Sequence, residues 1–262
     1  MVKIALDAGH GIHTAGKRTP DGEREWSFND KVLRACVAKL SKYQGVEIKR
    51  LDDSTGQSDV PLSARTNLAN LWKADALVSI HHNANSGKWG VHGGVETYVQ
   101  EKTASKASKD LAALVQPLIV KVMGLRNRGV KESNLHMLRE SRMPAILTEG
   151  GFMDSTTDIG AMRSDAKLKA QGEAIADGLV AYFKLKPKSS QSPNKKENHE
   201  LNFSSGTLKK TVEELLNSPA KQKQLIEAGI KGGSFGSVWL DTFNKNQLAK
   251  HDIIGLYMLH NK

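Results

Sequence analysis

The sequence contains one cysteine, Cys36, among its 262 residues. A single thiol excludes an internal disulfide framework and fits a reducing compartment. Cys36 falls within an apolar-periodic stretch that predicts a helix, and we interpret it as a buried packing residue. A catalytic thiol would require an activating environment, and the sequence places none beside it.

Long apolar runs are also missing. No stretch approaches the roughly 18 apolar residues that a membrane span needs. The amino terminus lacks a basic region followed by an apolar segment and a cleavage site, the pattern of a secretory signal. We therefore expect neither a membrane span nor an export signal.

Acidic residues are outnumbered, 28 against 38 lysines and arginines, which gives a formal net charge of +10. Such a surplus favours polyanionic partners without choosing among them. Residues 1–183 carry +4, whereas residues 184–203 and 204–262 carry +3 each, so the back of the chain is more basic per residue. Because basic and aromatic residues are not interleaved and no recognition helix is evident, we expect no nucleic-acid partner.

Apolar periodicity up to about residue 183 alternates between strand and helix patterns. This alternation predicts an α/β fold, with a mostly parallel twisted sheet and helices on both faces. The predicted strands cover residues 2–6, 46–49, 76–80, 93–99, 135–138 and 145–149. The predicted helices cover residues 25–43, 61–72 with Pro61 at the first helical position, 104–123 and 166–183.

The composition changes at Lys184 to a stretch rich in Lys, Ser, Asn and Pro. We predict three parts: a domain over 1–183, a basic flexible linker over 184–203, and a small, mainly helical domain over 204–262. Helices are expected at 207–216 and 218–230, the second with Ser218 as N-cap and Pro219 at the first helical position. Beyond residue 238 the apolar pattern also permits a short β hairpin.

Three predicted strands run into residues that can do chemistry: His10, then His81 or His82, and Glu149. Parallel strands deliver their carboxyl ends to one edge of a sheet, so these side chains are expected to share one site. Two histidines and a carboxylate with an open fourth position can hold a catalytic zinc ion, and a further carboxylate can act as general base. No helical HExxH motif is present, so such a site would be assembled from loops, and by itself His10 could equally be a core residue in a turn.

Seven short motifs follow one another along the chain: DAGHG at 7–11, EWSFN at 25–29, SARTNLAN at 63–70, SIHHNA at 79–84, GGVETY at 93–98, NRGVK at 127–131 and LTEGGFMD at 147–154. This series resembles the motifs of the zinc-dependent N-acetylmuramoyl-L-alanine amidases of the amidase-3 type. The resemblance spans about residues 2–183. It implies that His10, Glu25 and His81 bind one Zn²⁺ ion and that Glu149 is the catalytic general base and acid.

Two of these assignments involve a choice. The family glutamate stands four residues before an asparagine, here Asn29, which selects Glu25 over Glu23. The family histidine stands two residues before Asn83, which selects His81, and neighbouring side chains on a strand face opposite sides. His82 stands where the family has a small residue, and we interpret it as a substrate contact or a plain loop residue.

Three other positions of the motifs, Arg65, Asn67 and Glu96, are interpreted as polar groups of the framework. Gly150 stands where the family more commonly has a threonine or serine, and this departure leaves the neighbouring Glu149 in place.

The resemblance implies a peptidoglycan hydrolase that cuts the amide between the lactyl group of N-acetylmuramic acid and L-alanine. The basic tail is expected to bind an anionic cell-wall polymer. The two-part organisation without an export signal favours a bacteriophage endolysin of a Gram-positive, Bacillus-like host, cytoplasmic until it is released to the cell wall. A host or sporulation autolysin of the same activity, and a basic non-catalytic binding protein, remain as alternatives.

Overall fold

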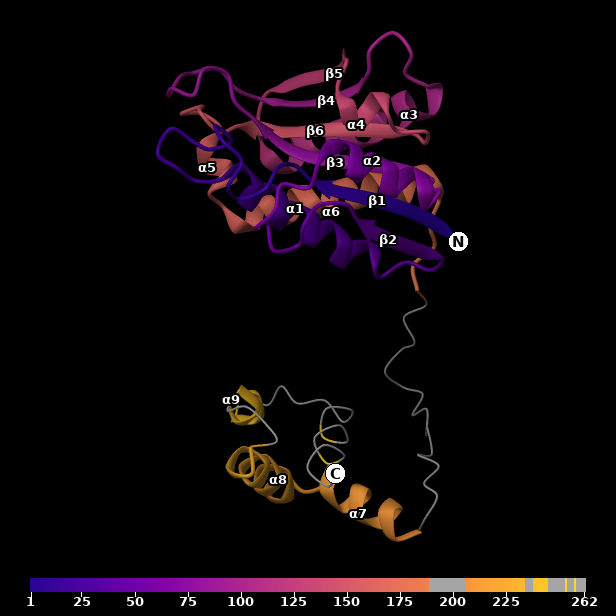
Figure 1. The fold of residues 1–262 in the computed structure, drawn as a ribbon, viewed down its shortest axis with the longest axis vertical. Coiled ribbons are helices and arrows are strands. Elements are labelled where there is room, and N and C mark those ends of the chain that lie inside the picture. The colour runs from indigo at the N-terminus through magenta and orange to yellow at the C-terminus, as the bar shows by residue number, and fades with distance from the viewer. Residues whose placement is uncertain (189–205, 234–237, 245–252, 254–256, 258–262) are drawn as a thin grey trace. The chain divides into compact units, whose positions relative to one another are not determined.

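The computed structural model describes residues 1–188, 206–233, 238–244, 253 and 257 (Figure 1). The chain divides into two compact units, Met1–Ser190 and Gln191–Lys262. Each unit is described by itself. Among the described residues, no helix has both the length and the apolar character needed to cross a membrane.

The first unit is built on one six-stranded sheet with the order β2-β1-β3-β6-β4-β5. All neighbouring strands are parallel except β6 and β4, so the predicted mostly parallel sheet is confirmed. The strands are β1 (Val2–Ala8), β2 (Val46–Arg50), β3 (Ala76–Asn83), β4 (Val95–Gln100), β5 (Asn127–Ser133) and β6 (Ala145–Phe152). Three parallel neighbours, β1, β3 and β6, form the centre, and their carboxyl ends meet at one edge.

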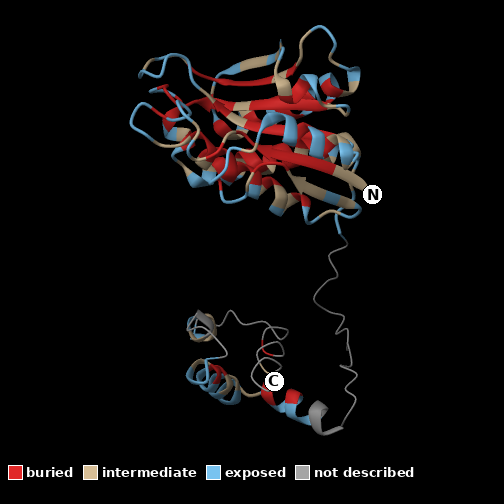
Figure 2. Cartoon of the chain, viewed as in Figure 1, coloured by how far each residue is buried: buried red, intermediate tan, exposed pale blue. Residues whose placement is uncertain are grey.

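Helices cover both faces of the sheet, as the alternation of patterns predicts (Figure 1). Successive side chains of β1 point to opposite faces. Ile4 and Leu6 join the larger core with α1 (Glu25–Leu40), α3 (Lys106–Met123) and α6 (Asp165–Phe183). Ala5 joins the smaller core with α2 (Leu62–Leu71) and α4 (His136–Arg139). The central strands are buried on both sides, while the outer surfaces of the helices are exposed (Figure 2).

The strand predicted at 135–138 is wrong, because α4 occupies these residues. Leu138 N donates to Leu135 O at 3.0 Å, the bond of a single helical turn. Four residues with two leucines three apart fit one helical turn as well as a strand, so periodicity could not separate the two. The edge strand β5 was missed because its sequence, NRGVKES, has almost no apolar residues, and the short helix α5 (Ile159–Met162) was missed too.

Other boundaries shift by a few residues. Pro61 is the N-cap of α2 rather than its first helical residue, and α1 ends at Leu40 instead of continuing to residue 43. β3 extends beyond its predicted end to Asn83, so His81 lies within the strand and not after it. β6 continues to Phe152, so Glu149 lies inside this strand and not at its last position.

Helices α1 and α6 pack in close contact at Gly172. A Cβ atom on this residue would lie 2.1 Å from the carbonyl oxygen of Val32 and 2.9 Å from the amide nitrogen of Cys36. Both are backbone atoms of α1, which cannot move aside independently. The Cys36 thiol is fully buried in this interface, as predicted, and burial raises its pKa well above the usual range.

We therefore expect Gly172→Ala to destabilise the protein by about 1–3 kcal/mol, the usual result of overpacking a core. The measurement is urea unfolding. Gly160→Ala is the matched control, because Gly160 lies in α5 and the added methyl group would meet no heavy atom within 4 Å beyond its chain neighbours and its own helix backbone. The control should be neutral or stabilising by up to about 1 kcal/mol. Equal midpoints for the two variants would contradict the close packing.

The described part of the second unit consists of three helices: α7 (Gly206–Leu216), α8 (Pro219–Lys231) and α9 (Val238–Asn244). Ser218 is the N-cap of α8, its side chain accepts from Lys221 N, and Pro219 is the first helical residue, as predicted. Ile226 is buried among Leu225, Ile230, Leu240 and Phe243. The alternative of a hairpin and most of the apolar set after residue 244 lie outside the described residues, as do residues 189–203 of the predicted linker.

Candidate metal centre and catalytic carboxylate

His10 lies in a sharp turn directly after β1. Its φ of 68° is in the left-handed region, which for a residue with a side chain costs about 1–2 kcal/mol. Gly9 is needed beside it, because a Cβ there would lie 2.0 Å from Cε1 of the His81 ring. The sequence Gly-His therefore brings one imidazole into the turn and makes room for the second.

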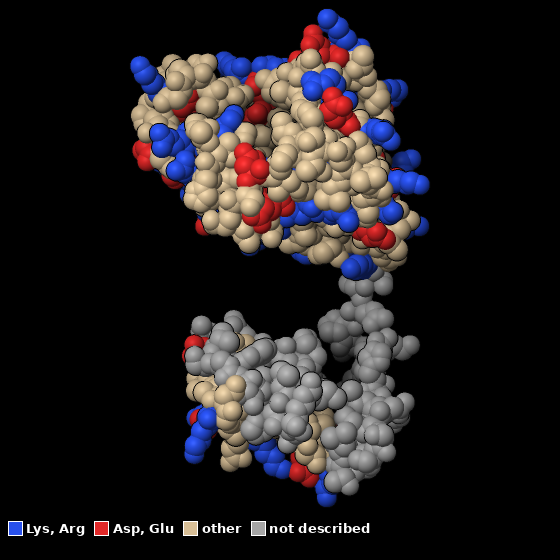
Figure 3. All heavy atoms as spheres, in the orientation of Figure 1, with Lys and Arg blue, Asp and Glu red and all other residues tan. Residues whose placement is uncertain are grey.

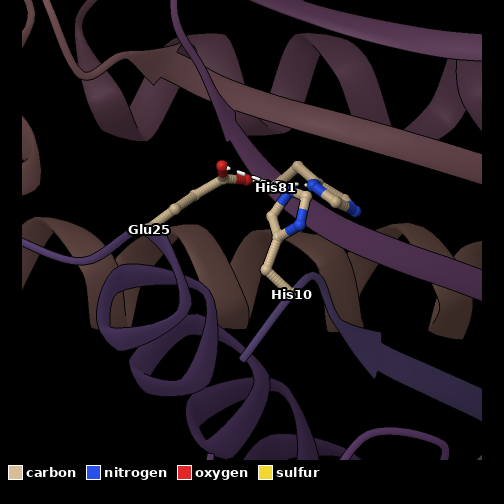
Figure 4. A group of neighbouring side chains, drawn as sticks. All are labelled: His10, Glu25 and His81. Carbon is tan, nitrogen blue, oxygen red and sulfur yellow. Dashed lines mark hydrogen bonds and ion pairs between the residues drawn. The ribbon is translucent and has the colours of Figure 1, made fainter. Parts of the chain in front are cut away.

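Glu25 is the first residue of α1, is buried, and points its carboxylate toward both histidine rings (Figure 4). Its Oε2 lies 3.3 Å from His10 Nε2, and its Oε1 lies 2.9 Å from His81 Nδ1. Burial alone would raise the pKa of this carboxyl, but the hydrogen bonds and charges of His10 and His81 hold the pKa well below its usual range. In turn, the pKa of His81 is raised, because the attraction of Glu25 exceeds the effect of burial.

The three side chains fit a zinc ion. One donor atom from each of His10, Glu25 and His81 lies within 4.8 Å of the other two, and no second such group occurs in the described parts of the chain. Tetrahedral bonds of about 2.0–2.1 Å would place neighbouring ligand atoms about 3.3 Å apart. Each histidine nitrogen lies near this distance from one of the two Glu25 oxygens, His10 Nε2 at 3.3 Å from Oε2 and His81 Nδ1 at 2.9 Å from Oε1. Two nitrogens and one carboxylate oxygen are also the donor set of known catalytic zinc sites.

Glu149 lies on β6 directly opposite His81 of β3. It lines one pocket with Glu25, His81 and Lys17. Its Oε2 is buried and has no hydrogen-bond partner among the described residues. Desolvation, opposed by His81 but reinforced by the negative charges of Glu25 and Glu96, raises the pKa of Glu149 to about 8.

Glu96 is a second buried carboxylate beside Glu149, its partner in the β4–β6 pair. It accepts hydrogen bonds from Arg128 and Lys131 at 2.5 Å each, from Tyr98 at 2.7 Å and from Asn83 at 2.8 Å. Burial opposes ionisation, but these partners lower the pKa of Glu96. The pKa of Glu96 is thus lowered while that of its neighbour Glu149 is raised. Such a separation of pKa values is typical of sites in which one carboxylate stays ionised and the other exchanges a proton.

His82 is not a loop residue, and this interpretation is corrected by the structure. It lies on β3 and is 1% exposed, on the opposite side of the strand from His81. Its Nδ1 lies 2.8 Å from Asn29 Oδ1, and its Nε2 lies 3.1 Å from the side-chain amide of Gln171. Both ring nitrogens are engaged in the core, so His82 is a structural residue. Gln171 could not be predicted from the sequence, because the residues of α6 carry no motif.

The protonation of the His82 ring follows from its partners. Asn29 donates from Nδ2 to Gly9 O at 3.1 Å, so Asn29 Oδ1 faces His82 as an acceptor, and His82 Nδ1 carries the proton. His82 Nε2 is then an acceptor. Exchange of the oxygen and nitrogen of the Gln171 amide places Nε2 opposite the ring as the donor. This orientation also gives a partner to Gln171 Nε2, which otherwise has none among the described residues. Desolvation lowers the pKa of His82 to about 4, which keeps the ring neutral.

We expect His82→Ala to destabilise the protein by about 2–4 kcal/mol, since it leaves a cavity and unpaired amides. The pKa of His82 is lower in the folded state than its ordinary 6.5, so the unfolded chain binds more protons between pH 6.5 and 4. The stability that His82 contributes is complete above pH 6.5 and is lost as the pH falls through 4. The difference in unfolding free energy between wild type and variant should therefore shrink over this range.

The control is His13→Ala, because His13 is exposed and its side chain makes a hydrogen bond only to Gln57, at 3.3 Å, among the described residues. This variant should stay within about 0.5 kcal/mol of wild type. A stability difference for His82→Ala that is constant from pH 4 to pH 8 would show that the ring does not stay neutral in the fold.

The sheet brings together two histidines and a carboxylate, and it places Glu149, a carboxyl with a raised pKa, beside them. This is the donor arrangement of the mononuclear metallohydrolases. Residues 4–181 match the Amidase_3 family, N-acetylmuramoyl-L-alanine amidase. The chain belongs to this family of hydrolases, which act on cell-wall peptidoglycan.

The relatives include bacterial and phage proteins. The chain is 35% identical over 185 residues to the N-acetylmuramoyl-L-alanine amidase CwlM of Bacillus licheniformis, covering 71% of this chain and 70% of that protein. It is 34% identical over 200 residues to the endolysin of Bacillus phage SPP1, covering 74% and 70%. The solved catalytic domain of CwlV, an N-acetylmuramoyl-L-alanine amidase from Bacillus (Paenibacillus) polymyxa, aligns with a TM-score of 0.65 and 27% identity, covering 71% of this chain and all of that one. The CwlV catalytic domain therefore shares the fold of the first unit.

Proposed function

We propose that this protein is a zinc-dependent amidase that hydrolyses the bond between the lactyl group of N-acetylmuramic acid and L-alanine of the stem peptide. The observation that supports it most directly is the grouping of His10, Glu25 and His81 beside Glu149, whose Oε2 has no partner among the described residues. Family membership supports the class of bond.

In this proposal the metal ligands and the general base are different residues. His10 Nε2, His81 Nδ1 and a Glu25 oxygen would hold the ion. When bound, zinc supplies a Lewis acid for the scissile carbonyl and lowers the pKa of water to near 7. Glu149 accepts the proton of the attacking water and returns it to the nitrogen of the leaving L-alanine. Burial raises the pKa of Glu149 to about 8, and a carboxyl that holds its proton this readily supports the proposed return of the proton to the leaving nitrogen.

The test uses purified Gram-positive walls and measures new amino termini and new reducing sugars. Wild type should release amino termini without reducing ends, and both chelator treatment and Glu149→Gln should abolish the release. Reducing ends would identify a glycosidase instead. Cleavage of other amides but of no purified muropeptide would show a hydrolase with a different substrate.

We further propose that the biological role is lysis of a Gram-positive, Bacillus-like host by a bacteriophage. The similarity to the SPP1 endolysin supports this, and the similarity to CwlM supports the alternative of a bacterial autolysin. Lysis on co-expression with a membrane-permeabilising protein, and its absence without one, is expected of an endolysin. Lysis that needs no such lesion would favour the autolysin.

The second unit is proposed to bind an anionic wall polymer. Residues 204–262 carry a net charge of +3. In a sedimentation assay with walls, full-length Glu149→Gln protein should pellet, and a chain ending at residue 190 should remain in solution. Walls from which anionic polymer has been extracted with acid should retain less protein. Equal pelleting of both chains would refute this role.

A non-catalytic nucleic-acid-binding protein is disfavoured by the distribution of charge. On the face of the first unit drawn in Figure 3, basic side chains are interspersed with acidic ones and do not form one continuous stripe. A protein that binds phosphates through its surface needs a clustered basic patch.

A further inference from the structure

Arg65 is the largest side chain that is fully buried among the described residues. It projects from α2 beneath the turn that carries His10. Its guanidinium has five N–H groups, and all five have acceptors. Nε donates to Val60 O at 2.8 Å, Nη1 to Asp7 Oδ1 at 2.7 Å and Ala8 O at 3.0 Å, and Nη2 to His10 O at 3.0 Å and Asp59 Oδ1 at 2.9 Å.

Two of these acceptors fix the turn itself. The carbonyls of Ala8 and His10 flank Gly9, and both point at the same guanidinium. A left-handed residue persists only where its surroundings determine its conformation. Arg65 holds the His10 turn in this conformation from outside the strand, because its guanidinium donates to carbonyls on both sides of Gly9.

The two carboxylates that bind Arg65, those of Asp7 and Asp59, also accept hydrogen bonds from other residues around the turn. Asp7 accepts from Arg65 through Oδ1 and from Ser79 of β3 through Oδ2, at 2.6 Å. Asp59 accepts from Arg65 and also from Thr14 Oγ1 at 2.7 Å, while Thr14 Oγ1 accepts from Gly11 N at 2.9 Å. The turn is therefore tied at its start, at His10 and at its end to one charged network.

We propose that Arg65 is a positioning residue for the metal centre: it holds the turn that directs His10 Nε2 toward Glu25. This inference rests on the proposed function, since it assigns a role toward the ion that His10, Glu25 and His81 would bind. Lysine can replace Arg65 only in part, because an ammonium has three donors around one point and cannot reach five acceptors spread around a planar fork. Removal of polar groups that orient metal ligands weakens metal affinity by about 10–100-fold.

The experiment measures zinc affinity by competition with a chromophoric chelator, and the visible absorption of the cobalt-substituted protein, for wild type, Arg65→Lys and Arg65→Met. We expect Arg65→Met to bind zinc about 10–100-fold more weakly, with Arg65→Lys intermediate, and a changed cobalt spectrum in both. Lys39→Met is the matched control. It removes a partly buried ion pair, Lys39 to Asp177 at 2.6 Å, between α1 and α6 and away from the turn, and should leave zinc affinity within twofold.

The outcomes separate the two proposals. A wild-type protein that binds no zinc overturns the proposed function and this inference with it. A wild type that binds zinc, together with a folded Arg65→Met variant of equal affinity and unchanged cobalt spectrum, overturns the positioning role alone. If Arg65→Met does not fold, Arg65→Lys decides by the same criterion.

Discussion

Replacement of Glu149 by glutamine is expected to lower kcat by a factor of about 10²–10⁴ with little change in zinc affinity. General acid–base catalysis contributes rate factors of this size. The amide keeps the shape of the side chain but can neither accept the proton of water nor return it to the leaving nitrogen. The measurement is steady-state hydrolysis of a soluble muropeptide by zinc-loaded protein. Glu140→Gln, which changes an exposed carboxylate in the same way, should retain wild-type activity.

The same substitution has a predicted effect on the stability of the metal-free protein. The pKa of Glu149 is raised to about 8 in the fold, from an ordinary 4.5, so the folded state binds more protons than the unfolded state between these pH values. Wild type therefore loses stability as the pH rises from about 4.5 to 8. Glu149→Gln lacks this loss, so its stability relative to wild type should increase over that range. A constant difference in unfolding free energy would show that Glu149 is solvated and does not have a raised pKa.

Removal of the metal, by a chelator or by His10→Ala, is expected to reduce kcat/KM by at least about 10³. Such a loss exceeds the contribution of a single hydrogen bond, because the Lewis acid and the activation of water disappear together. Added zinc should restore the chelated wild type and fail to restore His10→Ala. His13→Ala, three residues away and exposed, is the control for loss of a histidine. Full activity in excess chelator, with no zinc detected in the protein, would rule out the metal mechanism.

Zinc binding should also depend on pH in a defined direction. The pKa of His81 is raised in the metal-free site because Glu25 lies 2.9 Å away, so the ion competes with a proton for this nitrogen. Affinity should therefore fall as the pH decreases, and binding should release protons that calorimetry in two buffers of different ionisation enthalpy can count. A pH-independent affinity would contradict this competition.

Much of the site could be predicted from sequence because its residues follow strong local signals. His10 follows a buried strand and is flanked by two glycines, and parallel neighbours bring such strand ends to one edge. The choice between His81 and His82 came from the motif and from strand alternation, and the structure places the two rings on opposite sides of β3. The roles of His10, Glu25, His81 and Glu149 in catalysis stay predictions.

The rest depends on contacts between distant parts of the chain, which local patterns do not encode. β5 is polar and acquires its strand conformation from pairing with β4. His82 depends on Gln171, 89 residues away, and the acceptors of Arg65 come from segments up to 58 residues apart from it. Polar residues whose partners are remote give no periodicity, so their positions become clear only in three dimensions.

The point at which the first unit ends has a practical consequence. Lys188 N donates to Lys42 O, Gln44 N donates to Lys186 O, and Val2 N donates to Gly45 O, so residues 186–188 lie near the start of β1. His10 follows the other end of that strand, because β1 ends at Ala8. Anything fused after residue 188, whether a fluorescent reporter, an affinity tag or a targeting module, would begin about one strand length from the edge of the sheet that carries the candidate site. The chain thus offers a natural junction for building chimeric enzymes.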